Sequence, residues 1–559
     1  MPHSPKGVRY DNFYTPKNDD FYSQFLYAEL GTADRRIRLL RIRCLGSETN
    51  DTTPVNCDLL DNLSLAMMTG GYTTISYFAG DPNATEEINI NGKTFNAFAN
   101  LGYALRQARR FWMAKFPHQE LLLWADQVCI NQSNVSERSS QVSFMGDIYS
   151  GAQQVLVCLS TEEGVSGGVA WLNRLSRHIP KDYGLLKETD SDDDDDYSMS
   201  KQKEFFHAHW HEEDFHLGWD AFIRTILTSR WWSRAWVRQE FIRSPKAILL
   251  AANESIDWVD FWPVMDIYYT ATYDFDEPRA DFHQRSNHGF GISNSCMACV
   301  LGEDSSKFWT NGKRIHRMLG AKRSSEFNPG RLRDLLANLR DAHLCEASDS
   351  RDLVYAFLGL STHNYDINPQ YSPGSCLQDV FLQLACNVLS HTNNLETLRS
   401  AYLTQSRRIS DDLPSWVPDW RNCHAFQEGH FKFPEEPATF EKQVSCLRED
   451  DQGRKDRILR VRGTFCQTLH SRLEGYHPSF ISAVGDIIPT AGAVQDGDEA
   501  WLLYGATNIF VFRRQEQYYH LVGEILSVDG PLPMVHRLVK NLRDMVERDD
   551  ANIRFIEIC

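Results

Sequence analysis

The chain has 559 residues, of which 42% are hydrophobic and 24% are charged. This length allows roughly three or four domains with substantial hydrophobic cores. The formal net charge of −17 is opposite in sign to the basic surface of nucleic-acid-binding proteins, and it is unfavourable beside an anionic membrane. We therefore expect no nucleic-acid partner.

No targeting or membrane-spanning segment is evident in the sequence. Residues Met1–Tyr14 lack the apolar core of a signal peptide. The longest apolar run, Ala247–Ala252, is far shorter than the roughly 18 residues of a membrane span. The 13 cysteines are scattered, and the pair Cys296 and Cys299 has no second pair with which to hold zinc. These features predict a cytoplasmic protein without a metal site.

Residues 1–35 show no clear period and are interpreted as an N-terminal arm. The next region alternates between strand and helix patterns. Strands are predicted at 37–43, 72–78, 121–124, 154–160 and 247–252, and helices at 101–111, 134–152 and 221–242. Asn91-Gly92 lies between two alternating runs and predicts a hairpin with a type I′ turn. The alternation predicts an α/β domain over 36–257 with a mostly parallel sheet.

Residues 161–220 interrupt this pattern. They include six aspartates, Asp190 and Asp192–Asp196, and little continuous apolar pattern, so they are interpreted as an inserted, partly disordered acidic segment. Residues 258–430 are predicted to be mainly helical, with clear patterns at 332–339 and 377–389. Residues 431–559 carry short strand-like runs and predict a small β-rich C-terminal module, with strands at 458–461, 500–503, 509–512 and 518–522.

Three familiar catalytic patterns fail on spacing or context. Gly92-Lys93-Thr94 lacks the first glycine of a phosphate-binding loop, since residue 87 is glutamate. Ser166 lies between two glycines but does not directly follow a strand, as a hydrolase nucleophile must. His211 and His216 are five residues apart, about 140° around a helix, whereas a zincin needs a spacing of four.

Four stretches carry the most specific signal. They are Tyr72–Gly80, Leu123–Ala152, Arg230–Glu240 and Arg351–Leu360, with Pro414–Trp420 further on. Together they closely resemble the fungal heterokaryon-incompatibility (HET) domain family, whose domain would cover roughly residues 70–245. Ala79 and Ala125 depart from the family pattern, which usually has tryptophan and an aliphatic residue at these places. Gln495–Asp498 and Leu521–Glu524 look like the tail that often accompanies this domain.

The resemblance implies a role in fungal non-self recognition and programmed cell death after unlike cells fuse. The HET domain is remotely similar to the Toll/interleukin-receptor (TIR) domain, which implies a flavodoxin-like fold. In TIR domains a tryptophan precedes a glutamate by four residues, and Trp236 and Glu240 repeat that spacing. The serine usual two places before the tryptophan is Arg234 here.

By the same resemblance, Glu240 is the candidate catalytic residue for hydrolysis of NAD, which would be a substrate and not a cofactor. A carboxylate beside an aromatic wall can stabilise the positive charge that develops as nicotinamide leaves. Ligands of open α/β sheets bind at the carboxyl edge of the parallel strands. The predicted substrate-binding residues near that edge are Ser76, Tyr77, Gly80, Asp126, Arg138, Arg234 and Trp236.

Structural alternatives stand beside each of these assignments. Glu240 is equally interpretable as an ion-paired residue, with Arg234, Arg238 and Arg243 nearby in the sequence. Asp126 would then cap Asn131 or pair with Arg138. Ser76 and Tyr77 would have a packing role and hold the Ser76–Gly80 loop by a hydrogen bond. Arg351 and Asp352 are expected to pair at a helix start, and Pro414–Trp420 to dock the helical region onto the core.

Two mechanisms from different classes therefore compete. The first is an NAD glycohydrolase that self-association switches on, in response to a protein partner of an incompatibility system. The second is a non-catalytic, TIR-like assembly module that recruits cell-death partners, and Ala79 also raises the case of an inactive relative. The acidic segment 161–220 lies between two elements of the predicted site and is hypothesised to act as a gate.

Overall fold

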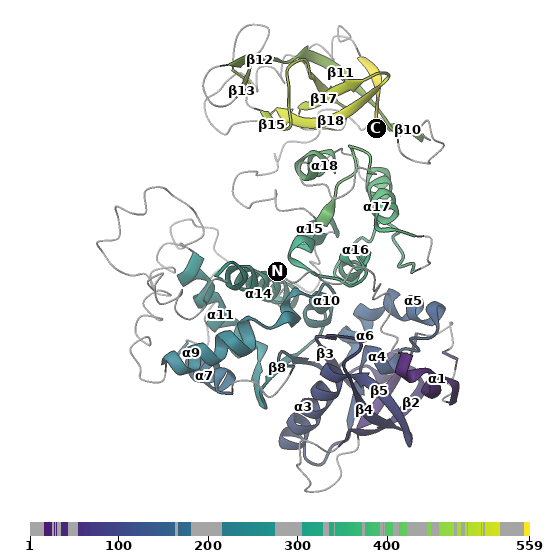
Figure 1. Ribbon diagram of the computed structural model, residues 1–559, viewed down its shortest axis with the longest axis vertical. Coiled ribbons are helices and arrows are strands. Elements are labelled where there is room, and N and C mark those ends of the chain that lie inside the picture. The colour runs from purple at the N-terminus through teal and green to yellow at the C-terminus, as the bar shows by residue number, and fades with distance from the viewer. Residues whose placement is uncertain are drawn as a thin grey trace, which may run out of the picture. The chain divides into compact units, whose positions relative to one another are not determined.

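The computed structural model (Figure 1) describes about two thirds of the chain. The described residues are 16–24, 27, 29–30, 35–42, 54–161, 166–179, 215–273, 305–327, 335–339, 341–371, 375–391, 395, 397–405, 413–421, 444–448, 458–473, 478–481, 487–488, 490–504, 506, 509–525 and 553–559. The chain divides into two compact units, Met1–Arg333 with Leu344–Thr362, and Asp334–His343 with His363–Cys559. The aspartate run, His211, and the pair Cys296 and Cys299 lie outside the described residues. The domain boundaries predicted from sequence stay predictions.

The first unit is built on a nine-stranded mixed sheet. In chain order its strands are β1 (Arg36–Ile42), β2 (Asn56–Ser64), β3 (Thr73–Tyr77), β4 (Thr85–Ile90), β5 (Lys93–Phe98), β6 (Leu121–Trp124), β7 (Gln154–Cys158), β8 (Ala247–Ala251) and β9 (Glu254–Asp257). They lie in the order β5-β4-β2-β1-β6-β3-β7-β8-β9. The neighbours β6, β3, β7 and β8 are parallel, which confirms a parallel core for the α/β sheet. β1 and β9, which flank it, are antiparallel to it.

The four parallel strands have a doubly wound order. Numbered by their place in the chain, they lie side by side as second, first, third and fourth. This is the order of flavodoxin-type sheets, in which the crevice between the first and third strands receives the ligand. In this sheet the crevice lies at the carboxyl ends of β3 and β7.

Helices of the first unit pack on this sheet or on one another (Figure 1). They are α1 (Asp19–Gln24), α2 (Leu65–Met68), α3 (Ala99–Lys115), α4 (Asp126–Cys129), α5 (Val135–Ser143), α6 (Met145–Gly151), α7 (Gly168–Ser176), α9 (Phe215–Phe222), α10 (Trp236–Ile242), α11 (Trp258–Tyr273), α14 (Ser305–Phe327) and α16 (Asp352–Leu358). Among the helices described, none has the length and hydropathy that crossing a membrane requires.

Several local predictions are confirmed. The chain reverses between Ile90 and Lys93, which pair directly, and Asn91 and Gly92 both have positive φ, 53° and 79°. These are the conformations of a type I′ turn. Asn134 begins α5 and its side chain accepts a hydrogen bond from the Glu137 amide, which confirms that a helix begins at this residue.

Two helix predictions are wrong in their extent. The helix predicted over 134–152 is broken at Phe144 into α5 and α6. In place of a continuous helix over 221–242, the chain forms a π-turn at Ile223–Leu227, a 3-10 turn (η3) at Arg230–Ser233, and then α10. The cause of the second break is tertiary, since Ser229 Oγ donates to Leu159 O, 2.5 Å away, and accepts from the Trp231 amide.

The segment predicted as an irregular insertion contains a packed helix. Within 161–220, α7 buries Val169, Trp171, Leu172 and Leu175, and it contacts α9 and α11. The apolar face of this nine-residue helix is too short to be recognised from the sequence, because a long acidic stretch follows it. The prediction of disorder is therefore wrong for residues 168–176.

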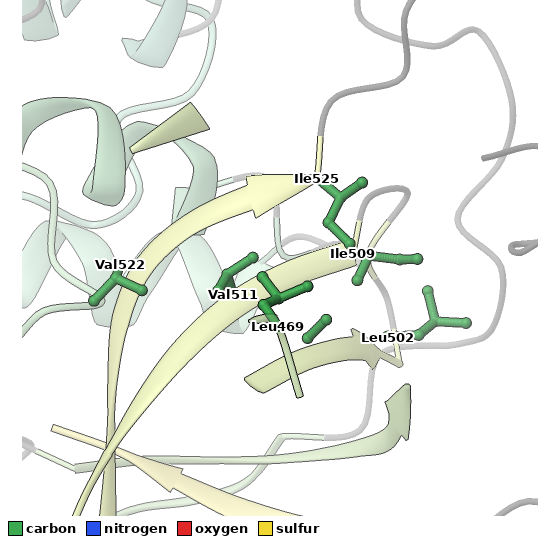
Figure 2. Packing of buried hydrophobic residues seen from close by; sticks show 7 residues of the cluster. Leu469, Leu502, Ile509, Val511, Val522 and Ile525 are labelled. Carbon is green, nitrogen blue, oxygen red and sulfur yellow. The ribbon is translucent and has the colours of Figure 1, made fainter. Parts of the chain in front are cut away.

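The second unit has a β-rich part, as predicted. A seven-stranded sheet joins β10 (Val444–Arg448), β11 (Ile458–Thr468), β15 (Thr490–Gly492), β16 (Glu499–Leu503), β17 (Ile509–Gln515), β18 (Tyr518–Ile525) and β19 (Ile553–Ile558), and a small sheet joins β12 (His470–Leu473), β13 (Pro478–Ile481) and β14 (Ile487–Ile488). Alternate residues of β17 and its neighbours turn one face inward. Figure 2 shows this buried cluster, which contains Leu469, Ala500, Leu502, Ile509, Val511, Val522 and Ile525.

Described helices of the second unit are α15 (Leu335–Leu339), α17 (Leu377–His391) and α18 (Thr397–Gln405). The segment Pro414–Trp420 joins this helical part to the seven-stranded sheet, since Trp420 packs edge-to-face on Phe381 of α17, with ring centroids 5.3 Å apart. The Ser415 amide donates to Cys559 O, 2.9 Å away, and Ser415 Oγ accepts from the Leu521 amide at 3.1 Å. The predicted docking of the helical region onto the α/β core through this segment stays a prediction.

Candidate functional site

Five of the eight predicted site residues meet at the carboxyl edge of the parallel strands. Ser76 and Tyr77 end β3, and Asp126 follows β6 as the first residue of α4. Arg234 precedes α10, and Glu240 lies within it. α10 contacts both β3 and β7, the two strands at whose carboxyl ends the crevice of the doubly wound sheet lies.

Glu240 is held inside this cluster by two neighbours. Ser76 Oγ donates to Glu240 Oε2, and Trp231 Nε1 donates to Ser76 Oγ at 2.7 Å. Only 3% of Glu240 and 1% of Ser76 are exposed to solvent. Burial raises the pKa of Glu240 to about 7, against the lowering effect of Arg234. Glu240 can therefore be charged or neutral near neutral pH, which suits an acid, a base or an electrostatic stabiliser.

Asp126 is the second carboxylate of the cluster. Tyr77 Oη donates to Asp126 Oδ1 at 2.9 Å, and the Gln127 amide donates to the same oxygen at 2.7 Å. Burial raises the pKa of Asp126, whereas the nearby Arg234 guanidinium lowers it. Asn131 is not capped by Asp126, because its amide donates to Glu137 Oε1. That alternative for Asp126 is wrong.

Arg234 is the cation shared by the two carboxylates. Its guanidinium donates to Tyr77 O, and its charge opposes the raised pKa of both Glu240 and Asp126. The other two arginines considered as partners of Glu240 are engaged elsewhere. Arg238 Nε donates to Cys345 Sγ at 3.2 Å, and Arg243 pairs with Asp147 at 3.5 Å.

The remaining three predicted residues occupy other places. Gly80 has φ +82°, and a Cβ there would come within 2.4 Å of Asn100 Nδ2, so this glycine shapes the loop after β3. Arg138 lies on α5, where its charge helps to lower the pKa of Asp349. Trp236 is the half-buried first residue of α10.

The spacing of the motif predicts an aromatic role for Trp236, but the indole that donates to Ser76 is that of Trp231. Its side chain is fully buried and packs edge-to-face against Trp232, with ring centroids 4.8 Å apart. Tyr149, also buried, was missed as well; its hydroxyl donates to Ile75 O at 3.2 Å and helps to lower the pKa of Glu240. Both residues lie within the motifs that resemble the HET family, Leu123–Ala152 and Arg230–Glu240. Membership of these motifs could have marked them as site residues.

The motif at 351–360 supports the helix that carries Glu240. α16 packs on α10, and the two helices meet α6 at a close contact between Gln239, Gly146 and Gly359. A Cβ at Gly359 would lie 2.6 Å from the Gln239 side chain. Arg351 pairs with Asp349, 2.6 Å away, and the predicted pair of Arg351 with Asp352 stays a prediction.

Within the described part of the chain, no group of three or more His, Cys, Asp or Glu side chains could hold a metal ion. The chemistry available to the cluster is that of its two carboxyls, one guanidinium and three hydroxyls.

Comparisons with known proteins identify the region that holds this cluster. Residues 72–240 match the model of the family described as "Heterokaryon incompatibility protein (HET)". The match begins immediately before β3 and ends at Glu240. Over 417 residues the chain is 25% identical to "Heterokaryon incompatibility protein 6, OR allele" of Neurospora crassa. The alignment covers 66% of this chain and 57% of that relative, and no solved structure gives a significant match.

Proposed function

Since this chain is a HET-domain protein, we propose that it acts in fungal heterokaryon incompatibility and triggers programmed cell death by hydrolysing NAD. The proposed enzymatic activity rests on the burial and the raised pKa of Glu240. Glu240 is a buried carboxyl with a pKa raised to about 7, at the crevice where doubly wound sheets bind their ligands.

In the proposed reaction, Glu240 acts on the ribose that carries nicotinamide. As the bond between C1 of the ribose and the pyridinium nitrogen breaks, the carboxylate stabilises the positive charge that develops on the sugar. Water adds to C1, the electron pair of the broken bond leaves with neutral nicotinamide, and one proton is released. The products are nicotinamide and ADP-ribose.

Contacts in the cluster suggest a role for each neighbour. Ser76 and Trp231 fix the orientation of the Glu240 carboxyl through the hydrogen bonds between them. The charge of Arg234 acts on both carboxylates, and its guanidinium is the favoured candidate to contact a substrate diphosphate. Arg138, beside Asp349, is the less favoured candidate for that contact.

We propose that the α/β unit is TIR-like. Support comes from the order of β6, β3, β7 and β8 and from the place of Glu240 on the helix before β8. The resemblance also suggests activation by self-association, with a protein partner of the incompatibility system as the trigger.

A second function is favoured by a different observation. Glu240 is only 3% exposed and its carboxyl already accepts a hydrogen bond from Ser76. A buried, internally bonded carboxyl suits a structural role, and the unit would then be a non-catalytic module that assembles cell-death partners.

Nicotinamide release separates the two functions. The purified full chain is incubated with NAD over a range of protein concentrations, and nicotinamide and ADP-ribose are measured by chromatography. We expect equal amounts of both products, with a rate per molecule that rises with protein concentration. Intact NAD at the highest concentration, together with cell killing that persists in Glu240→Gln, would establish the assembly module in place of the enzyme.

A further inference from the structure

We propose that residues Leu344–Glu346 form a latch that holds the loop Ser229–Ala235 closed over Ser76 and Glu240. The latch would control entry to the site, and this regulatory meaning rests on the proposed function. The latch lies outside the residues that match the HET family model, which end at 240.

The loop Ser229–Ala235 covers the carboxyl end of β3 through two side chains. Trp231 Nε1 donates to Ser76 Oγ at 2.7 Å, and the Arg234 guanidinium donates to Tyr77 O. Ser76 and Glu240 are 1% and 3% exposed. A ligand can therefore reach the Glu240 carboxyl only if the structure around it opens, and this loop supplies two of the contacts that must break.

The latch pairs with the loop on both sides of Arg234. The Glu346 amide donates to Ser233 O at 2.5 Å, and the Ala235 amide donates to Glu346 O at 3.1 Å. These two bonds form a short parallel bridge between Arg234 and Glu346. In addition, the Ser233 hydroxyl lies within hydrogen-bond distance of Glu346 Oε2, at 3.1 Å, and of Arg230 O, at 2.9 Å.

The latch is itself anchored to α14. Arg314 Nε donates to Leu344 O at 2.6 Å. The loop is thus held to α14, a helix beyond the matched region, through residues 344–346. Fixing the latch therefore fixes the backbone on either side of Arg234, and with it the position of the Trp231 indole.

The latch is exposed at its Glu346 end and buried at its other end, where Leu344 is 4% exposed and Cys345 Sγ accepts from Arg238 Nε at 3.2 Å. The Glu346 side chain is 59% exposed, and its ion pairs with Arg230 and Arg314 are long, at 4.0 and 3.7 Å. Exposed pairs of this kind contribute little to stability. The loop is also irregular, a 3-10 turn that follows a π-turn, and such backbone is common at functional sites.

Chain connectivity offers a route for release. The segment Leu344–Thr362 belongs to the first unit, but the residues on both sides of it, Asp334–His343 and His363–Cys559, belong to the second. A partner that binds the second unit could therefore pull on the latch through the chain itself.

The test removes the bridge and measures access to Glu240. Proline at residue 346 has no amide hydrogen to donate to Ser233 O, so Glu346→Pro should open the loop. Ser348→Pro is the matched control, since Ser348 is exposed and lies outside the bridge. The readouts are hydrogen exchange of a peptide over 229–236 and labelling of Glu240 by a water-soluble carbodiimide with a glycine ester. Exposed Glu87 serves as the internal labelling standard.

We expect Glu346→Pro to increase both readouts at least tenfold and Ser348→Pro to leave them unchanged, with exchange in β3, β7 and β8 as in the wild type. If Glu346→Pro does not fold, the double variant Ser233→Ala with Glu346→Ala should increase labelling at least threefold. Unchanged exchange and labelling in a folded variant would overturn the latch. Increased labelling without nicotinamide release, from wild type or variant, would leave the latch standing and reject NAD hydrolysis.

Discussion

Glu240→Gln is expected to lose nicotinamide release by at least about 100-fold and yet to stabilise the first unit at pH 8 by about 3 kcal/mol. The glutamine keeps an oxygen that can accept from Ser76 but carries no charge. Burial raises the pKa of Glu240 from its usual 4.5 to about 7, so the folded chain holds this proton more tightly than the unfolded chain. Wild-type stability therefore falls as pH rises from about 4.5 to about 7, and the variant escapes this loss.

Hydrogen exchange of β3, β7 and β8 amides in urea at pH 4 and pH 8 measures this difference for the first unit alone. The stability that Glu240→Gln gains over the wild type should be nearly zero at pH 4 and reach its full value at pH 8. The control is Glu87→Gln, an exposed glutamate of β4, which should show no such dependence. Equal stability of Glu240→Gln and wild type at pH 8 would contradict the raised pKa.

Arg38→Leu is expected to destabilise the first unit by about 3 to 5 kcal/mol, the usual cost of removing one member of a buried ion pair. The Arg38 side chain is fully buried. It donates to Asp61 Oδ1 at 2.8 Å and to Glu137 Oε1 at 2.6 Å, and also to Cys129 O at 3.1 Å. It thereby ties β1 to β2 and to the chain that leads from β6 into α5, and its loss leaves two carboxylates without this cation.

Arg41→Leu is the matched control on the same strand. Arg41 pairs with Asp58 at 3.1 Å, but its side chain is 41% exposed, and such a pair contributes about 1 kcal/mol at most. Unfolding followed by exchange of the same strand amides compares the two variants. If Arg38→Leu and Arg41→Leu lower the free energy of unfolding by similar amounts, the buried network around Arg38 stabilises the unit no more than the exposed pair does.

Local sequence patterns were sufficient to predict where the parallel strands lie and where much of the candidate site forms. The apolar runs that became β6, β7 and β8 were continuous, as expected of strands covered on both faces. Because parallel strands end at one edge, Ser76 and Asp126 could be expected to meet there, whereas the resemblance to TIR domains added Glu240.

Other features depend on contacts that no local pattern encodes. Ser229 breaks the predicted helix by bonding to Leu159 O, which brings Trp231, and not Trp236, to Ser76. Glu346 pairs with a loop more than 100 residues earlier in the chain. The alternation in β1 predicted a strand, but the partners that bury Arg38 come from β2 and α5.

The pH dependence of nicotinamide release tests the account most directly, because it joins the proposed chemistry to the raised pKa of Glu240. If the ionised carboxylate stabilises the departing ribosyl cation, kcat/KM for NAD should rise with pH and level off with an apparent pKa of about 7. A flat profile between about pH 5 and 9, or no release at any pH, would contradict the assignment of Glu240 as the catalytic residue.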